Sequence, residues 1–586
     1  MATTAALYTG LSGLSANSRW LDVSGNNIAN ANTTAYKTTR LAFENQFSRT
    51  LSAGSQPSSV FGGSNPTQIG YGVSVAGTQR SFAPGPIEPT GDARDLAIDG
   101  NGFFVVDDGG TQVYTRAGSF RPNENNILTT VTGETLMGYG VDDNFTINQG
   151  VLQPIEIPLG TLTIAEPTTV VQFAGNLDAD GTIATRGAQL DLMGTSTAGL
   201  ATISTATVPP ATGDLISAAG LLTEIEDPAL PGTDTPLFTV GQIIEIDGAE
   251  RGDGSSIGPV QYTITATSTL DELAMFLSDA FGIDSSMGTN PDGSTPGVSI
   301  DATNGRIRID GNIGSVNDID IEATDLRLLD STGDLIRSPF VVDEVAEANG
   351  ESVRTSVTVY DSLGTPLVLD LTMVLSNTSS SGTDWTYFVS SEDDSDASGL
   401  LTSGTLSFDT NGQLTTTDPI NVLLDRANSG AATPLNFQID LSSGSDRLTA
   451  LTDTNSTLGA IFRDGAPIGE LTTFAVGGDG VITGIFANGL TRTIGQVPLA
   501  TFTNQEGLLD LGGNLFSVAP NSGEPVITTA GQFGSGQLIS GALEGSNVDL
   551  SQEFINLILA STGYNASSRV IQESDELLQQ LLLIGR

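Results

Sequence analysis

The stretch LDVSGNNIANANTTAYK, from Leu21 to Lys37, decides how the N-terminal part of the chain folds. A helical pattern of apolar residues runs into it, yet four of the seven residues from Asn26 to Asn32 are asparagine. Asparagine side chains compete with the backbone for hydrogen bonds, so they favour caps and turns over helix interiors. The stretch therefore predicts a long N-terminal helix that ends among its own asparagines.

Apolar residues on either side of this stretch, and again at the far end of the chain, repeat with a helical spacing. The N-terminal seam consists of Leu7, Leu11, Leu14, Leu21 and Ile28. Segment 546–586 carries a second seam at Leu550, Phe554, Leu557, Tyr564, Ile571, Leu578 and Leu582. Heptad repeats of this kind are typical of coiled coils. We expect the termini to pair, either as an assembly interface or as an intramolecular pair that merely ties the ends together.

The composition restricts the partners and the chemistry. Lys and Arg number 21 against 68 Asp and Glu, a net charge of −47, which argues against binding to nucleic acid or to an anionic membrane surface. Lys37 is the only lysine, and residues 1–50 carry four basic against two acidic side chains. Cysteine and histidine are absent, so disulfides, zinc–thiolate sites and imidazole catalysis are excluded. We find no membrane-inserting run and no Sec signal peptide.

The long middle of the chain is predicted to be β. Short apolar runs alternate with Gly, Asp and Asn turns, as in DLAIDGNGFFVV from Asp95 and TSVTVYDSLGTPLVLDL from Thr355. Segment 41–86 is rich in Ser, Gly and Gln and is predicted to be an extended connector. Residues 191–345 differ in composition, being rich in Asp and Pro, and one short helix is predicted in STLDELAMFLSDAFG. This difference suggests an inserted domain. The expected fold class is therefore mainly β with α-helical termini.

Several short motifs suggest chemistry, but each has a plainer interpretation. Gly100 and Gly102 lack the third glycine of a dinucleotide fingerprint. DADG at Asp178 and GGDG at Gly477 lack the distal ligands of an EF-hand and are better read as hairpin turns. The RGD tripeptide at 251–253 is short enough to arise by chance, and no carboxylate pair is singled out for glycoside hydrolysis. We expect no catalytic residue, no metal site and no cofactor.

Both ends resemble the bacterial flagellar rod and hook protein family. The N-terminal signature is matched at Leu21, Asp22, Asn26, Asn27, Ile28, Ala29, Asn30 and Thr33, and the C-terminal one at Ser546, Asn547, Val548 and Asp549. One departure is Ala35, where glycine is common. The motif at Asp361, Ser362, Leu363 and Gly364 is similar to hook proteins and is lacking in the shorter rod proteins. The resemblance covers about 1–180 and 350–586.

The resemblance implies a nested architecture. It comprises a terminal coiled-coil domain (1–40 with 546–586), the connector (41–86), an inner β domain (87–172 with 435–545), an outer β domain (173–190 with 346–434) and an additional outer domain (191–345). The stretch near 190–345 lies outside the resemblance, so its role is not inherited. On this basis the asparagines of the N-terminal signature are expected to cap the helix and to bond to neighbouring subunits.

The implied function is structural and not enzymatic: a subunit of the extracellular flagellar hook, a curved hollow tube that joins rod to filament as a universal joint. Expected partners are copies of itself, the distal rod protein, the hook cap scaffolding protein, the hook–filament junction protein and the flagellar type III export apparatus, which replaces a cleaved Sec signal. Alternatives are a distal rod subunit and, from another class, a secreted acidic adhesin or hydrolase. The insert could also be a surface-binding module.

Overall fold

The structure, a computed structural model, describes residues 2–194, 199–203, 216–231, 233–286, 288–395, 399–442, 447–452 and 455–584. Small parts of the predicted domains, including residues 1 and 585–586, lie outside these ranges. The chain divides into two compact units, Met1–Thr163 with Gly469–Arg586, and Ile164–Ile468. It passes from one unit to the other inside β13 (Thr163–Glu166) and again inside β33 (Ala466–Val476).

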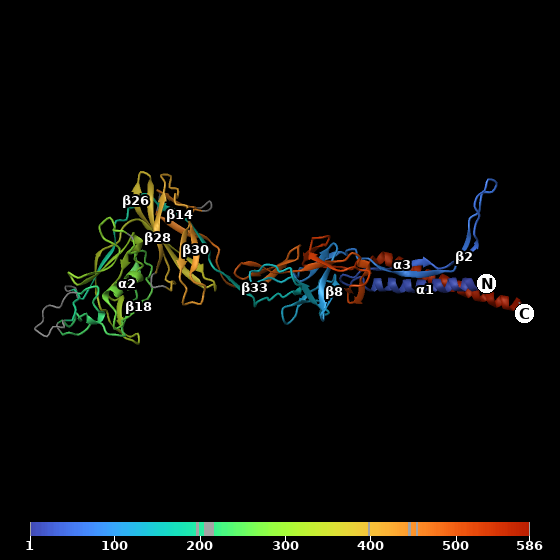
Figure 1. The fold of residues 1–586 in the computed structure, drawn as a ribbon, viewed down its shortest axis with the longest axis horizontal. Coiled ribbons are helices and arrows are strands. Elements are labelled where there is room, and N and C mark those ends of the chain that lie inside the picture. Colours follow the sequence, from blue (N-terminus) through green and yellow to red (C-terminus); the bar gives the residue numbers. More distant parts are fainter. Residues whose placement is uncertain are drawn as a thin grey trace. The chain divides into compact units, whose positions relative to one another are not determined.

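In the first unit, the two terminal helices lie side by side (Figure 1). Helix α1 (Ala2–Ala29) and helix α3 (Leu550–Ile584) run antiparallel, since residues near the start of α1 contact the second half of α3 and residues near its end contact the start of α3. The predicted long N-terminal helix is confirmed, and it ends at the asparagines. The fold class of mainly β with α-helical termini that pack together is confirmed as well.

Small residues make the closest contacts between α1 and α3, and Ile571 of the predicted seam packs against one of them. Ala16 and Ala560 are buried, and a Cβ added to Gly10 would lie 2.8 Å from Cγ1 of Ile571. None of the twelve predicted seam residues is fully buried; Phe554 is 51% exposed and Leu582 is 72% exposed. The 4-3 spacing marks an apolar face without saying which surface covers it, so a coiled coil remains a prediction.

The segment predicted as an extended connector forms two antiparallel ribbons. Strand β1 (Thr39–Asn45) pairs with β4 (Val73–Arg80), and beyond them β2 (Ser48–Ser52) pairs with β3 (Thr67–Gly70). The first ribbon lies against α1, where the rings of Trp20 and Phe43 meet edge to face at 5.6 Å. Figure 1 shows the second ribbon leading away from the helices.

The rest of the first unit is a β domain around an aromatic core. Its ten-stranded sheet contains β7 (Phe103–Asp108), β8 (Thr111–Thr115), β9 (Arg121–Pro122), β10 (Leu128–Thr129), β11 (Thr135–Gly138), β12 (Gln153–Pro154), β36 (Pro498–Thr501), β37 (Leu509–Gly512), β38 (Leu515–Ser517) and β39 (Val526–Thr529). Further pairs are β5 (Ile87–Pro89) with β41 (Ala542–Glu544), β6 (Leu96–Asp99) with β40 (Gln537–Ser540), and β34 (Val481–Phe486) with both β33 and β35 (Thr491–Gln496). Phe82, Phe103, Phe502 and Phe516 pack edge to face in the core.

The second unit contains two β cores. In the first, a four-stranded sheet of β25 (Ser352–Tyr360), β26 (Pro366–Ser379), β27 (Gly382–Ser390) and β28 (Leu400–Phe408) shares a core with a five-stranded sheet. That second sheet contains β14 (Val170–Asp178), β29 (Ile420–Leu424), β30 (Leu435–Asp440), β31 (Leu448–Leu451) and β32 (Thr457–Arg463). The assignment of residues 435–468 to the inner domain is therefore corrected, because β30, β31 and β32 all pair with β14.

The other core of this unit extends from Ala188 to Phe340, so it begins slightly before the predicted insert (191–345). Its strands are β15 (Gly187–Met193), β16 (Ile243–Ile246), β17 (Glu250–Arg251), β18 (Val260–Thr263), β19 (Gly297–Asp301), β20 (Arg306–Ile313), β21 (Ile319–Asp320), β22 (Leu326–Leu329), β23 (Leu335–Arg337) and β24 (Val341–Ala346). The predicted short helix is confirmed as α2 (Leu270–Ala280), where Thr269 and Glu272 form a capping box. Leu270, Leu273 and Leu277 bury one face of α2 in this core.

Candidate functional site

The two signatures, about five hundred residues apart in sequence, meet where α1 ends. Asn27 is buried, and its Nδ2 donates to the carbonyl of Thr39 at 2.8 Å and to Oε1 of Glu553 at 3.2 Å. Its Oδ1 accepts from the hydroxyl of Tyr36 at 3.0 Å and from the amide of Thr39 at 3.1 Å. Every hydrogen-bonding group of this amide side chain is thus used within one chain. Asn27 ties the end of α1 to the start of α3.

Two other asparagines of the signature terminate the helix. Nδ2 of Asn30 donates to the carbonyl of Asn26 at 2.9 Å, and Oδ1 of Asn30 accepts from the hydroxyl of Thr33 at 3.1 Å. Such local bonds offer the backbone an alternative to further helical turns, which is why the helix ends here. The bonds found are all intramolecular, so the expected bonds from these asparagines to neighbouring subunits stay a prediction.

The C-terminal signature closes the same region from the other side. Oδ1 of Asn547 accepts from the amide of Thr38 at 2.7 Å, and its Nδ2 donates to the carbonyls of Ser81 at 2.9 Å and Ala83 at 3.0 Å. This one side chain therefore joins both ends of the connector to the segment that leads into α3.

Asp549 begins the C-terminal helix. Its Oδ1 accepts from the amides of Ser551 at 2.9 Å and Gln552 at 3.2 Å, which would otherwise have no partner at a helix start. The amide of Val548 donates to Oγ of Ser546 at 3.4 Å. The negative charge of Asp549 at the helix N-terminus is also favoured by the helix dipole.

A buried charge cluster lies directly beside the signatures. Nζ of Lys37 lies 2.7 Å from Oε1 of Glu544, and Nε of Arg116 lies 3.1 Å from Oε2 of the same carboxylate; all three side chains are 0% exposed. Lys37 also donates to the carbonyl of Ala83 at 2.8 Å, and the amide of Gly85 donates to Glu544 at 2.8 Å. We call Asn27, Tyr36, Lys37, Arg116, Glu544, Asn547 and Glu553 the terminal junction.

The electrostatics of the terminal junction depend on Glu544. Burial and, to a smaller extent, the nearby Arg116 lower the pKa of Lys37 to about 8, although the adjacent Glu544 raises it. Burial also lowers the pKa of Arg116 from its usual value. Lys37 stands out in the sequence as the only lysine, whereas Arg116 and Glu544 were not predicted as site residues. Nothing local could reveal a partner that is 507 residues away.

Ala35, the position where the family commonly has glycine, adopts a left-handed backbone conformation with φ of +58°. A residue with an L side chain is strained in this conformation. Ala35 is buried, and its amide donates a hydrogen bond to the backbone carbonyl of Glu544 at 2.8 Å. We expect Ala35→Gly to stabilise this region by about 1 kcal/mol. Hydrogen-exchange protection of residues 33–38 should then rise by about fivefold.

The matched control for this change is Ala76→Gly in β4, where the backbone φ is not positive. Glycine there should lower stability by about 0.5–1 kcal/mol, because it only adds freedom to the unfolded chain. A loss of protection at 33–38 in the Ala35 variant similar to the loss around residue 76 in the control would contradict the assignment of strain.

The remaining motifs lie at turns or inside packed regions. Asp361 is buried, and its Oδ1 accepts from the amides of Leu363 and Thr365, both at 2.9 Å, in the turn between β25 and β26. The GGDG motif is the turn between β33 and β34. Arg251 of the RGD tripeptide is partly buried, which lowers its pKa to about 10, and it donates to the carbonyl of Phe281 at 3.4 Å.

The described part of the chain contains neither a metal-binding cluster nor a membrane-spanning helix. Within those residues, no group of three or more Asp, Glu, His or Cys side chains is placed to hold a metal ion. Of the helices in the same ranges, none combines the length and the apolar character needed to cross a bilayer.

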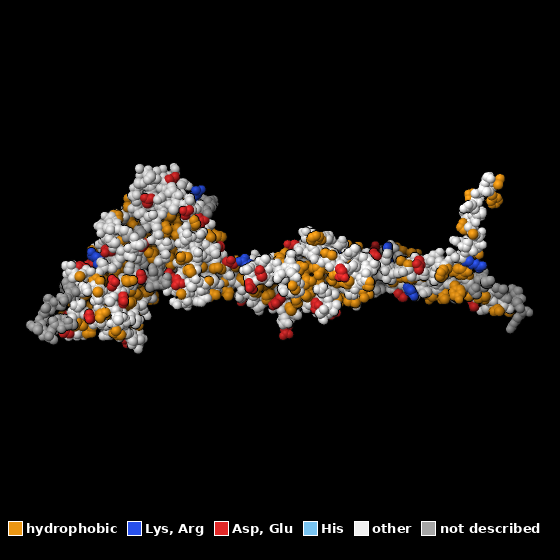
Figure 2. All heavy atoms as spheres, in the orientation of Figure 1, with side chains coloured by type: hydrophobic (Ala, Val, Ile, Leu, Met, Phe, Trp, Pro, Cys, Tyr) orange, Lys and Arg blue, Asp and Glu red, His pale blue; other side chains and the backbone are white. Residues whose placement is uncertain are grey.

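The outer face of α3 is an unpaired apolar surface. Large hydrophobic side chains project from it with 43% to 74% of their area exposed at Leu550, Phe554, Ile555, Ile558, Leu559, Val570, Leu577, Leu582 and Leu583. Figure 2 shows hydrophobic side chains gathered on the helical end of this unit. Exposed apolar area of this extent marks an interaction surface in a soluble protein.

Comparisons with known proteins cover both ends and the second unit. Family descriptions match as "Flagella basal body rod protein" at 7–37, "Flagellar hook protein FlgE/F/G D1 domain" at 97–186, "Flagellar basal body protein FlaE D2 domain" at 329–466 and "Flagellar basal body rod FlgEFG protein C-terminal" at 539–583. Of the seven residues of the terminal junction, Arg116 alone lies far in sequence from both signatures.

Full-length relatives are similar along the whole chain. The flagellar hook protein FlgE of Treponema pallidum is 27% identical, with 99% of each chain covered, and that of Salmonella typhimurium is 25% identical, with 98% of each chain covered. Among solved structures, the flagellar hook protein FlgE2 of Helicobacter pylori matches 78% of this chain and 100% of its own at 18% identity, with a TM-score of 0.35.

Proposed function

The chain belongs to the family of flagellar basal-body rod and hook proteins, and from this we infer that it is a structural subunit of the bacterial flagellar hook. The family is one of structural proteins, and its hook members polymerise into the extracellular hook. The observation that carries this inference is the likeness to hook proteins over the whole chain, including the terminal signatures.

The terminal helices supply the assembly surface. Within one chain their closest contacts place glycine, alanine and serine against residues that include Ile571, and the large apolar side chains of α3 that stay exposed remain for other copies. A contact between different patches of neighbouring copies that does not close on itself produces an open helical filament. The exposed seam residues therefore act between subunits of a hollow tube; they are Leu11, Leu550, Phe554, Tyr564 and Leu582.

The terminal junction then connects the assembled core to the β domains. Torque must pass from the core to the outside of the tube through this region, and a buried cluster in which one carboxylate pairs with two cations is suited to transmitting it. The second unit carries the outer contacts, which slide as the hook bends and acts as a universal joint. Its inserted domain adds further surface for such contacts.

A subunit of the hook would also contact the proteins that flank the hook and those that build it. They are the distal rod protein at the base, the hook–filament junction protein at the tip, the hook cap scaffolding protein during growth, and the flagellar type III export apparatus. The apolar, weakly charged terminal helices would remain unfolded in a narrow export channel and fold only when paired.

Electron microscopy of the purified chain tests the function. Under polymerising conditions, with a hook cap protein added, we expect the full-length chain to form curved hollow tubes, and a chain that lacks 546–586 to remain monomeric because it has no α3. Straight tubes would favour a rod subunit instead. Full-length protein that stays monomeric under every condition would count against a polymer-forming function.

A further inference from the structure

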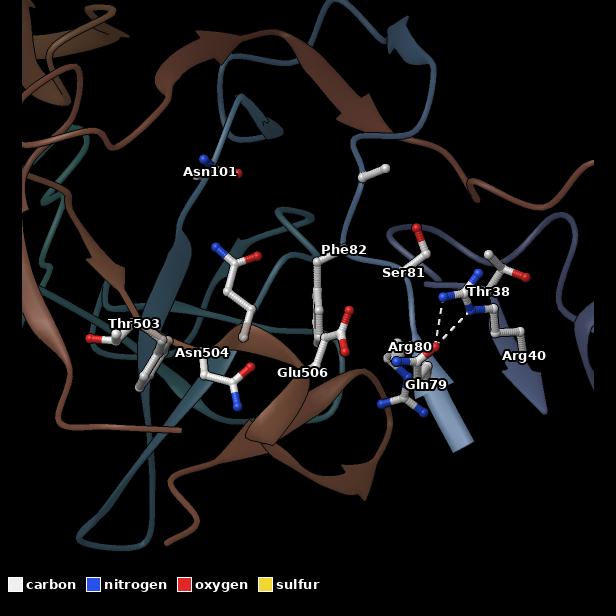
Figure 3. A pocket seen from close by; sticks show the side chains of 13 residues that line it. Thr38, Arg40, Gln79, Arg80, Ser81, Phe82, Asn101, Thr503, Asn504 and Glu506 are labelled. Atoms are coloured by element: carbon white, nitrogen blue, oxygen red, sulfur yellow. Dashed lines mark hydrogen bonds between the residues drawn. The ribbon is translucent and has the colours of Figure 1, made fainter. Parts of the chain in front are cut away.

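A groove of about 740 Å³ runs along the first unit beside the terminal junction. Its walls come from the ends of the β1–β4 ribbon, with Arg40, Gln79 and Arg80, and from the segment after β36, with Asn504 and Glu506 (Figure 3). Phe82 is buried among the aromatic rings of the inner core at the base of this region, so the groove has a rigid floor.

The two arginines that line the groove differ in their partners: Arg80 has a carboxylate partner, and Arg40 has only an amide. Arg80 lies 2.6 Å from Oδ2 of Asp510 and 5.2 Å above the ring of Phe516. Arg40 is exposed and donates from Nε and Nη2 only to Oε1 of Gln79, at 2.9 Å and 2.6 Å, as Figure 3 shows. Across the described residues, no carboxylate lies within 4.0 Å of Arg40. The exposed Glu506 is the one acidic side chain that lines the groove.

The surroundings of Arg40 are unusual for this chain. Glu44 is the one acidic residue between Asp22 and Glu88, a stretch with four basic residues, although the chain contains 68 acidic residues and has a net charge of −47. The ribbon next to the groove is therefore locally basic on a strongly acidic protein. When two copies approach, their acidic surfaces repel, and this basic region is a place where a carboxylate of another copy is attracted.

An apolar edge lies next to the groove. Strand β37 forms one end of the ten-stranded sheet, and it begins three residues after Glu506. Its side chains Leu509 and Leu511 are both at least half exposed. An exposed edge strand with apolar side chains is open to pairing with another chain. The groove thus has a free cation on one wall and apolar anchor points beside the other.

We propose that the groove and β37 together form an interface that receives a carboxylate-bearing turn of a second copy, with Arg40 as the specificity determinant. This rests on the proposed polymer and names a contact within it. Asp108, Glu124 and Asp143 are exposed acidic side chains at turns of the same unit and are the candidate donors of the carboxylate.

The test measures the critical concentration for polymerisation of the full chain by sedimentation. We expect Arg40→Glu to raise it by more than about tenfold, because a carboxylate then meets a carboxylate, and Arg40→Gln to raise it less. The wild-type value should rise with added salt, and this dependence should be weaker for Arg40→Gln. Arg447→Glu, the same change at an exposed site of the second unit, is the matched control and should leave it unchanged.

Charge exchange then identifies the partner. In the Arg40→Glu chain, Asp108→Arg, Glu124→Arg or Asp143→Arg should restore assembly if that turn occupies the groove. The proposal is overturned if Arg40→Glu assembles at the wild-type concentration, or if none of the three exchanges restores it. Wild-type chain that forms no tubes in the same assay would instead count against the proposed function. Unchanged circular dichroism of each variant shows that it is folded.

Discussion

Replacing Glu544 by glutamine should open the terminal junction at a cost of about 3–5 kcal/mol in stability. The carboxylate is the shared partner of Lys37 and Arg116, and neither cation has any exposed side-chain area. Without it, two positive charges remain buried beside each other with only carbonyl oxygens as partners. Hydrogen-exchange protection of residues 83–89 and 542–549 should fall by about two to four orders of magnitude.

A partial rescue separates lost charge pairing from general damage at this position. Lys37→Met in the same chain removes one of the two stranded cations, so the double variant should be more stable than Glu544→Gln alone. Asp92→Asn, which breaks an ion pair of Arg94 at the surface, is the control and should cost less than about 1 kcal/mol. If Glu544→Gln behaved like this surface control, the cluster would not hold the junction together.

The second large effect is expected from Leu559→Asp on the outer face of α3. Leu559 is 53% exposed in the single chain, so the change should leave the monomer folded. In the tube this face is covered by other copies, and an unpaired carboxylate buried there costs at least about 3 kcal/mol. We expect the critical concentration to rise by more than about a hundredfold, with no tubes visible by electron microscopy.

Leu335→Asp is the matched control for this variant. Leu335 is 64% exposed in β23 of the second unit, and the same charge is added there without touching the terminal helices. It should assemble close to wild type. Equal loss of assembly in both variants would point to net charge as the cause, whereas normal assembly of Leu559→Asp would show that this face of α3 stays free in the polymer.

The ends of the chain were predictable because their signals are local. Asparagines at the end of an apolar repeat indicate a helix and its stop, and α1 ends at Ala29 as that pattern requires. Asp549 at the start of α3 and the capping box of α2 are signals of the same kind. The alternation of short apolar runs and turns likewise predicted a β-rich middle.

Contacts between distant segments were not predictable from these patterns. An apolar repeat indicates that one face of a helix avoids water, but its spacing is the same whether the cover comes from the same chain or from another. Only the close approach of Gly10 and Ala560 to the facing helix reveals that small residues take the intramolecular contact. The leucines that stay exposed are the ones we propose for contacts in the polymer.

The boundary between the β domains and the partners in the buried charge cluster also depend on contacts between distant segments, so only the tertiary structure could reveal them. Residues 435–463 look like any other strands, and only their pairing with β14 assigns them to the second unit. Composition revealed that Lys37 is the only lysine but not that Glu544 faces it. Local sequence thus established the helices, the turns and the family of this chain. The partners of its exposed faces and buried charges arise from long-range contacts, whose energy depends on distances that no local pattern encodes.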